Sequence, residues 1–166
     1  MEEYLVLRGA LMLIVRIIHQ TIMKQEYKEL LLKDLTCRIS YGVIVNVSGI
    51  SNVKLTSVSW YGEVGVDDGS TYLYPISEIK PYLFSLSSIS EDQKYDFYCR
   101  FIKNDCNFED FKKFYLYNGM WRRKLLTLTS LYDIEAMIEW FHKNHIDYRD
   151  LIPMELAIDA SELNIY

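Results

Sequence analysis

Short β-strand patterns between residues 43 and 74 constrain the fold of this chain more than any other feature. Runs of β-branched and aromatic residues, which are typical of strands, are interrupted there by glycines. The runs occupy residues 43–47, 53–61 and 64–66, and the glycines are Gly49, Gly62 and Gly65. Strands so closely spaced leave no room for the crossover helices that a parallel sheet requires. We therefore predict a small antiparallel, barrel-like sheet.

A turn signal supports the antiparallel arrangement. The tetrad from Asp67 to Ser70 contains Asp and Gly residues, which tolerate the positive φ angles of tight hairpin turns. The residues that follow it, Thr71 to Tyr74, are predicted to return as the partner strand.

Helical patterns flank the predicted sheet. Residues 25–39 carry apolar side chains at a spacing near 3.6 residues, which indicates an amphipathic helix. After the sheet, capping residues predict three helix starts, at Ser90 with Gln93, at Asn107 and at Ser130. The predicted fold class is α+β, with a small antiparallel, barrel-like sheet preceded by a helix and followed by three or so packed helices.

The length of 166 residues matches one domain. We assign residues 1–22 to an N-terminal helical extension and residues 23–166 to a single α+β domain. Within that domain, residues 23–84 are expected to form the helix and the small sheet, and residues 85–166 the helical part. A second interpretation stays open, in which Met23 is the natural start and residues 1–22 are upstream sequence.

The extension is not predicted to cross a membrane. Its longest uninterrupted apolar run, Ala10 to Val15, is much shorter than the roughly 20 residues that a spanning helix needs. Glu2 and Glu3 stand where a signal peptide carries positive charge. The three cysteines are odd in number and lack CxxC spacing, so we expect reduced thiols and a cytoplasmic location.

Three stretches of the sequence are similar to a known group of proteins. They are KELLLKDLTCRISYGV at 28–43, YPISEIKPYLFSLSSIS at 74–90 and EAMIEWFHKNHIDYRDLIPMELAIDA at 135–160. Together they resemble small proteins found in prophage and mobile-element regions of gut anaerobic bacteria. The resemblance covers most of residues 23–160. It implies a bacterial, cytoplasmic, phage-associated setting, and it carries over no functional residues.

One segment combines basic and aromatic side chains. Its candidate contacts to nucleic acid or to a partner are Lys112, Lys113, Tyr117, Trp121, Arg122, Arg123 and Lys124. Cations of this kind bind phosphates, and the aromatic rings between them can stack on bases. The alternative is that the aromatic residues belong to the core and the cations are solvated or paired. The net charge of −5 argues against a generally basic nucleic-acid binder.

Two histidines have a spacing that also occurs in metal sites. His142 and His145, with Asp147 close by, lie three residues apart near a predicted helix end. A real metal site needs a further ligand that the sequence does not place, so we interpret them as a structural or solvated pair. The chain contains no P-loop, GxGxxG, nucleophile elbow or HExxH motif. We therefore assign no catalytic, cofactor-binding or metal-binding residue.

Two functions follow from these observations as hypotheses. The first is a non-enzymatic protein–protein interaction module of phage or mobile-element origin, with a protein partner whose identity the sequence does not give. The second is a nucleic-acid-binding accessory protein that uses the basic and aromatic segment 112–124.

Overall fold

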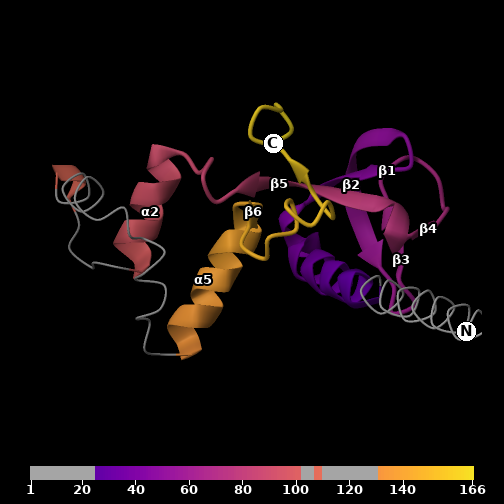
Figure 1. Ribbon diagram of the computed structural model, residues 1–166, viewed down its shortest axis with the longest axis horizontal. Coiled ribbons are helices and arrows are strands. Elements are labelled where there is room, and N and C mark those ends of the chain that lie inside the picture. The colour runs from indigo at the N-terminus through magenta and orange to yellow at the C-terminus, as the bar shows by residue number, and fades with distance from the viewer. Residues whose placement is uncertain (1–24, 102–106, 110–130) are drawn as a thin grey trace, which may run out of the picture. The chain divides into compact units, whose positions relative to one another are not determined.

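The computed structural model describes residues 25–101, 107–109 and 131–166, and these residues form an α+β structure (Figure 1). A helix covers residues 25–38 and continues into the 3-10 turn η1, Ile39–Tyr41. The strands are β1 (Ile44–Val47), β2 (Ile50–Val58), β3 (Glu63–Val66), β4 (Tyr74–Pro75), β5 (Ile79–Ser85), β6 (Ile146–Asp147) and β7 (Ile158–Asp159). The remaining elements are the 3-10 turn η2 (Ile76–Glu78), α2 (Glu91–Phe101) and α5 (Leu131–Lys143).

The chain divides into two compact units, and each is described by itself. Unit 1 is Met1–Pro81 and unit 2 is Tyr82–Tyr166, so the boundary falls within β5. The assignment of residues 23–166 to a single domain stays a prediction.

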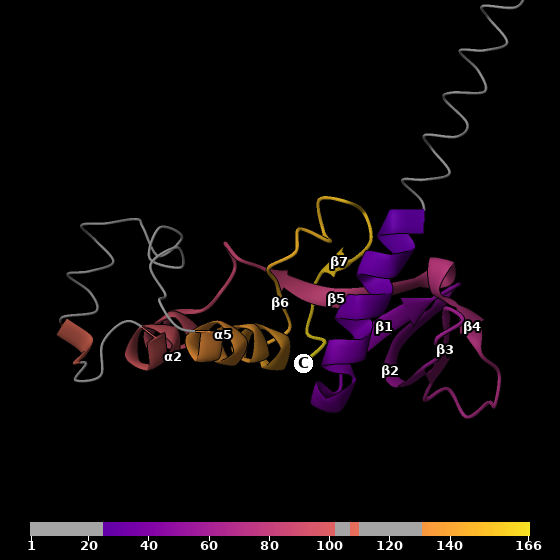
Figure 2. The ribbon, with the colours of Figure 1, turned by 90° about the horizontal axis from the view of Figure 1, so that it is seen from below.

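Unit 1 consists of the helix and an antiparallel array of strands. β1 pairs with β2, β2 with β3, and β3 with β4, while the first residues of β5 pair with the other edge of β1. Val45 and Val47 of β1 are fully buried, as are Leu35 of the helix and Val64 of β3. The helix lies alongside β1 and β2 in both ribbon views (Figures 1 and 2). Alternating valines therefore supply one face of this core and the helix supplies the other.

The end of the first helix agrees with its sequence signals. Gly42 adopts a φ of 70° and its N–H donates to the carbonyl of Ile39 at 3.3 Å. This left-handed conformation is accessible to glycine and closes the last turn. The chain then enters β1, where the period of the buried residues changes from helical to alternating.

Unit 2 consists of the rest of β5, two parallel strands and two described helices. β6 pairs with β5 through Phe84 and Ile146, and β7 pairs with β5 through Tyr82 and Ile158, both in parallel. A cluster of buried residues fills the core of this unit. Its members are Ile89, Phe97, Trp140, Phe141 and Ile146. The predicted capping box begins α2, since Gln93 N–H donates to Ser90 Oγ and Ser90 N–H donates to Gln93 Oε1.

The predicted α+β class is confirmed, and two details of the sheet are corrected. The seven described strands form a mixed sheet that is not closed into a barrel, with pairing order β4-β3-β2-β1-β5-β6 and β7 on β5. The prediction of an antiparallel sheet missed β6 and β7, because strands of two residues leave no periodic pattern. The long connection that parallel pairing requires is present, since the helical part of the chain lies between β5 and β6.

Several sequence predictions fall partly or wholly outside the described residues. They are the N-terminal extension 1–22, most of the helix expected after Asn107, and the helix cap Ser130. The predicted hairpin return is shorter than expected, because only Tyr74 and Pro75 pair with β3. Within the residues that the structure describes, no helix is both long enough and apolar enough to span a bilayer.

The expectation of three reduced thiols is corrected. Cys99 is disulfide-bonded, whereas Cys37 is a free and exposed thiol; Cys106 lies outside the described residues. Disulfides persist mainly in oxidising compartments. The cytoplasmic location therefore loses the support that reduced cysteines would give it, and it stays a prediction.

Candidate functional site

The turn between β2 and β3 exposes two large aromatic side chains at the edge of unit 1. Trp60 is 97% exposed and Tyr61 is 92% exposed. Because both side chains project from the turn and not from the paired strands, neither is covered by the rest of the unit. An aromatic side chain of this kind can bury about 150–250 Å², so the turn holds much apolar area in water.

Hydrogen bonds hold this turn in shape. The Ser59 N–H donates to the Glu63 carbonyl at 2.7 Å, and the Gly62 N–H donates to the Ser59 carbonyl at 3.1 Å. The Tyr61 N–H donates to Ser59 Oγ at 3.2 Å. Gly62 has a φ of 78°, a conformation that costs a residue with a side chain extra energy. The exposed rings are therefore carried on an ordered turn.

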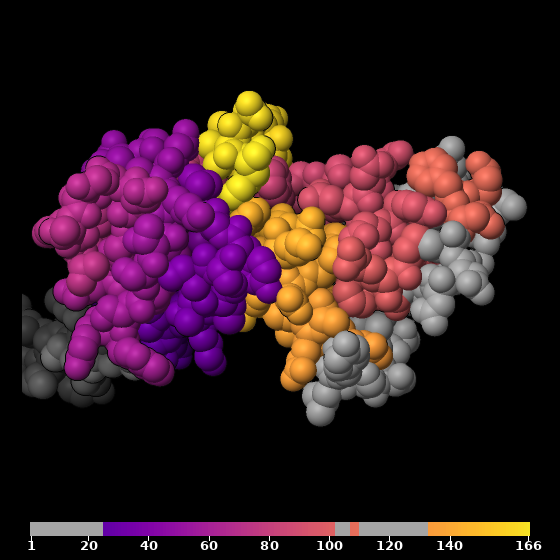
Figure 3. Space-filling view, turned by 180° about the vertical axis from the view of Figure 1, so that it is seen from behind, coloured from indigo at the N-terminus to yellow at the C-terminus, as the bar shows by residue number. Residues whose placement is uncertain are grey.

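An open groove of about 700 Å³ lies beside this turn, between the helix of residues 25–38 and the end of β2. The helix contributes Glu26, Glu29 and Lys33 among others, and the strand end contributes Trp60. On the face of unit 1 seen in Figure 3, the indigo helix and the purple to magenta strands lie side by side. We call this surface the Trp60 groove, comprising Trp60, Tyr61 and the helix residues that line the cavity.

The charges around the Trp60 groove are mainly negative. Glu26 and Glu29 line it on the helix side. Lys33 is the single cation of the lining residues. Gln25 Nε2 donates to Glu29 Oε1 at 3.0 Å, and no described residue forms an ion pair with Glu26, Glu29 or Lys33. Within the described part of the chain, no ion pair neutralises these three groups.

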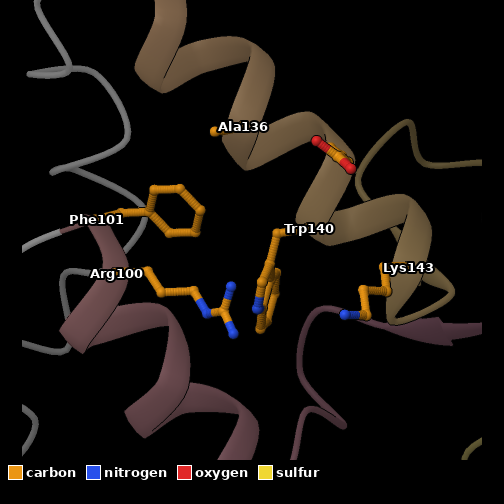
Figure 4. Close-up of a pocket in the computed structure, with 6 residues that line it drawn as sticks. Arg100, Phe101, Ala136, Trp140 and Lys143 are labelled. Carbon is orange, nitrogen blue, oxygen red and sulfur yellow. The ribbon is translucent and has the colours of Figure 1, made fainter.

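A second, smaller pocket of about 240 Å³ lies between α2 and α5 of unit 2 (Figure 4). Arg100 and Phe101 of α2 face Trp140 and Lys143 of α5 across it. Beside it, Asp96 accepts hydrogen bonds from Arg100 Nε at 2.8 Å and from Trp140 Nε1 at 2.7 Å.

These contacts give Asp96 a structural role. Partial burial works to raise the pKa of Asp96, but the hydrogen bonds from Arg100 and Trp140 outweigh it and hold the pKa below its ordinary value. Because Asp96 joins a donor on its own helix to one on α5, it ties the two helices together.

The two histidines have separate neighbours. His142 Nε2 lies 2.9 Å from the Tyr148 hydroxyl, whereas the His145 ring stacks on Tyr166 with centroids 3.9 Å apart. The Asp147 carboxylate accepts the backbone N–H groups of Leu151 and Ile152, at 2.9 and 2.7 Å, and so caps the following turn. Among the described residues, no cluster of three or more His, Cys, Asp or Glu side chains is arranged to hold a metal ion.

The structure tests none of the candidate contacts named from the sequence. Lys112, Lys113, Tyr117, Trp121, Arg122, Arg123 and Lys124 all lie outside the described residues. Sequence reasoning missed Trp60 and Tyr61, because their aromatic character placed them in the strand pattern of residues 53–61. The adjacent Gly62 was the available signal, since a glycine directly after such a run marks a turn.

The geometry is thus an ordered turn that presents two aromatic rings beside an acidic groove. No protein-family model, no curated protein and no solved structure matches this chain.

Proposed function

We propose that the protein is a non-enzymatic protein–protein interaction module that docks a protein partner on the Trp60 groove. The observation that carries the proposal is the nearly complete exposure of Trp60 on an ordered turn beside a groove. The proposed phage or mobile-element origin is a separate part of this proposal, and its support is the sequence resemblance alone.

The energetics favour an interface at this position. Covering most of the Trp60 side chain removes about 150–250 Å² from water, which corresponds to an upper estimate of about 4–6 kcal/mol at about 25 cal/mol per Å². Tryptophan and tyrosine are enriched among the residues that dominate binding energy. Because the turn is already ordered by backbone hydrogen bonds, binding loses little conformational entropy there.

The charges at the Trp60 groove favour a protein over a nucleic acid. Glu26 and Glu29 would repel a phosphate backbone, which requires cations to replace its counterions. Nucleic-acid binding through the segment 112–124 remains an alternative proposal. The negative charges of the Trp60 groove in unit 1 do not support this alternative.

Site-specific photocrosslinking in the full-length chain tests the docking proposal. A photoreactive phenylalanine analogue replaces Tyr61 in one version and Tyr72, which is also exposed but lies in the β3–β4 loop, in a control. After nuclease treatment of a bacterial lysate, we expect a defined protein to be captured from position 61 and not from position 72.

The captured protein is then purified and its affinity measured. A hot-spot residue contributes at least about 2 kcal/mol, so Trp60→Ala should weaken binding by about 30-fold or more, whereas Tyr72→Ala should change it by less than about threefold. Equal binding to the wild type and to Trp60→Ala would refute the proposal.

A further inference from the structure

We infer that the Trp60 groove receives a lysine or arginine side chain of the partner, held between the indole ring of Trp60 and the carboxylates of Glu26 and Glu29. This inference rests on the proposed docking function and specifies the chemistry of the occupant. It is drawn from the residues of unit 1 that line the groove and from their charges.

The helix places its two carboxylates on the side that lines the groove. Glu26, Glu29 and Lys33 are separated by three and four residues, and residues at these spacings share one face of a helix. All three line the groove together with Trp60. A side chain that enters the groove therefore meets an aromatic ring on one wall and ionisable groups on the other.

The sum of the charges favours a cation. Among the residues that line the groove, Glu26 and Glu29 contribute −2 and Lys33 contributes +1, which leaves a net charge of −1 beside the exposed indole. A lysine or arginine can place its aliphatic stem on the ring and its charged head near the carboxylates. The indole face attracts the same cation through its quadrupole, and the carboxylates add charge-assisted hydrogen bonds.

Other occupants fit the groove less well. An acidic side chain would be repelled by the net negative charge. A purely apolar segment would bury the Trp60 ring, but it would also displace water from Glu26 and Glu29 without replacing their hydrogen bonds, which is unfavourable. A lysine or arginine side chain can contact the Trp60 ring and the carboxylates of Glu26 and Glu29 at the same time.

Selection from a random peptide library displayed on phage tests the inference, with the full-length protein as the target. Peptides that bind the wild type and not Trp60→Ala are retained, and we expect lysine or arginine to be enriched at one position in them. Replacing that residue with glutamine in a synthetic peptide should weaken binding about tenfold or more, because it removes both the cation–π attraction and the charged hydrogen bonds.

Charge variants of the protein provide the second readout. The double variant Glu26→Gln with Glu29→Gln should weaken the selected peptide about tenfold at low salt and flatten its salt dependence, because the attraction between charges is screened by ions. Glu162→Gln is the control: it removes an exposed carboxylate that does not line the groove and should leave the affinity unchanged within about twofold, because a single exposed charge contributes little.

The exposed thiol of Cys37 reports on occupancy, since Cys37 also lines the groove. Saturating peptide should slow its alkylation by iodoacetamide several-fold in the wild type. Trp60-dependent peptides that lack enriched cations, or that leave Cys37 fully reactive, would overturn this inference while leaving the docking function intact. Failure to obtain any Trp60-dependent peptide would also overturn it, and crosslinking at position 61 would then decide the docking function separately.

Discussion

The buried ion pair in the helix of residues 25–38 provides a direct test of how burial governs the stability of this fold. Arg38 Nε donates to Asp34 Oδ2 at 2.6 Å and Arg38 Nη2 to Asp34 Oδ1 at 3.2 Å, and both side chains are 0% exposed. α2 contains an Asp–Arg pair with the same spacing. There, Arg100 Nε donates to Asp96 Oδ1 at 2.8 Å, but the two side chains are 57% and 45% exposed.

Replacing each arginine with methionine keeps the aliphatic stem and removes the charge. Arg38→Met leaves the Asp34 carboxylate buried without its guanidinium partner, and removing one member of a buried ion pair costs about 3–5 kcal/mol. Arg100→Met removes an exposed pair within a helix, which contributes about 0.3–0.5 kcal/mol. The structure therefore predicts that the first substitution lowers the free energy of unfolding roughly tenfold more than the second.

Urea denaturation followed by circular dichroism measures the two effects. With a urea dependence of about 1–3 kcal/mol per M, the loss from Arg38→Met lowers the midpoint by about 1 M or more. Hydrogen exchange shows which unit is destabilised. Faster exchange in peptides from β1 and β2 would assign the loss of stability in Arg38→Met to unit 1, and exchange in peptides from α2 and α5 measures the effect of Arg100→Met on unit 2.

A double substitution separates burial of charge from loss of packing. Asp34→Leu with Arg38→Met removes both charges, and replacing a buried pair with apolar residues is often neutral or stabilising. We therefore expect the double variant to be more stable than Arg38→Met alone. If Arg38→Met and Arg100→Met shift the midpoint equally, or if the double variant is the least stable, the reasoning from burial is wrong.

Three further predictions concern packing, pH and nucleic acid. A Cβ added at Gly65 would lie 2.5 Å from Ser57 Oγ, so Gly65→Ala should cost about 1–3 kcal/mol in urea denaturation, and adding Ser57→Ala should recover part of it. Because the folded-state pKa of Asp96 is lowered from 3.8, its ionised form stabilises the fold above that pH, and the stabilisation is lost as the pH falls through the folded pKa. The stability difference between the wild type and Asp96→Asn should therefore be present at pH 6 and vanish in strong acid; a difference independent of pH would contradict this. In gel-shift assays we expect no binding of single- or double-stranded DNA even at low salt; a shift that weakens steeply with salt and is lost on replacing the cations of segment 112–124 would support the alternative function.

The sequence by itself was sufficient for the elements whose signals are local. Helical spacing over residues 25–39, the capping pair Ser90 and Gln93, and the alternating valines of β1 each depend on neighbours a few residues away. All three appear in the structure as predicted. Local signals also sufficed for the α+β class, because a strand-rich stretch flanked by helical patterns has few other solutions.

The tertiary structure alone decided how distant segments combine. β6 and β7 are two residues long and become strands only because β5 lies beside them, so their parallel pairing has no signature in the chain. The groove likewise brings residues of the first helix together with Trp60, although β1 and β2 lie between them in the sequence. Whether an aromatic side chain is exposed depends on which other segments pack against it. A sequence pattern gives a residue's preference for burial, but not whether the tertiary structure places another segment over it.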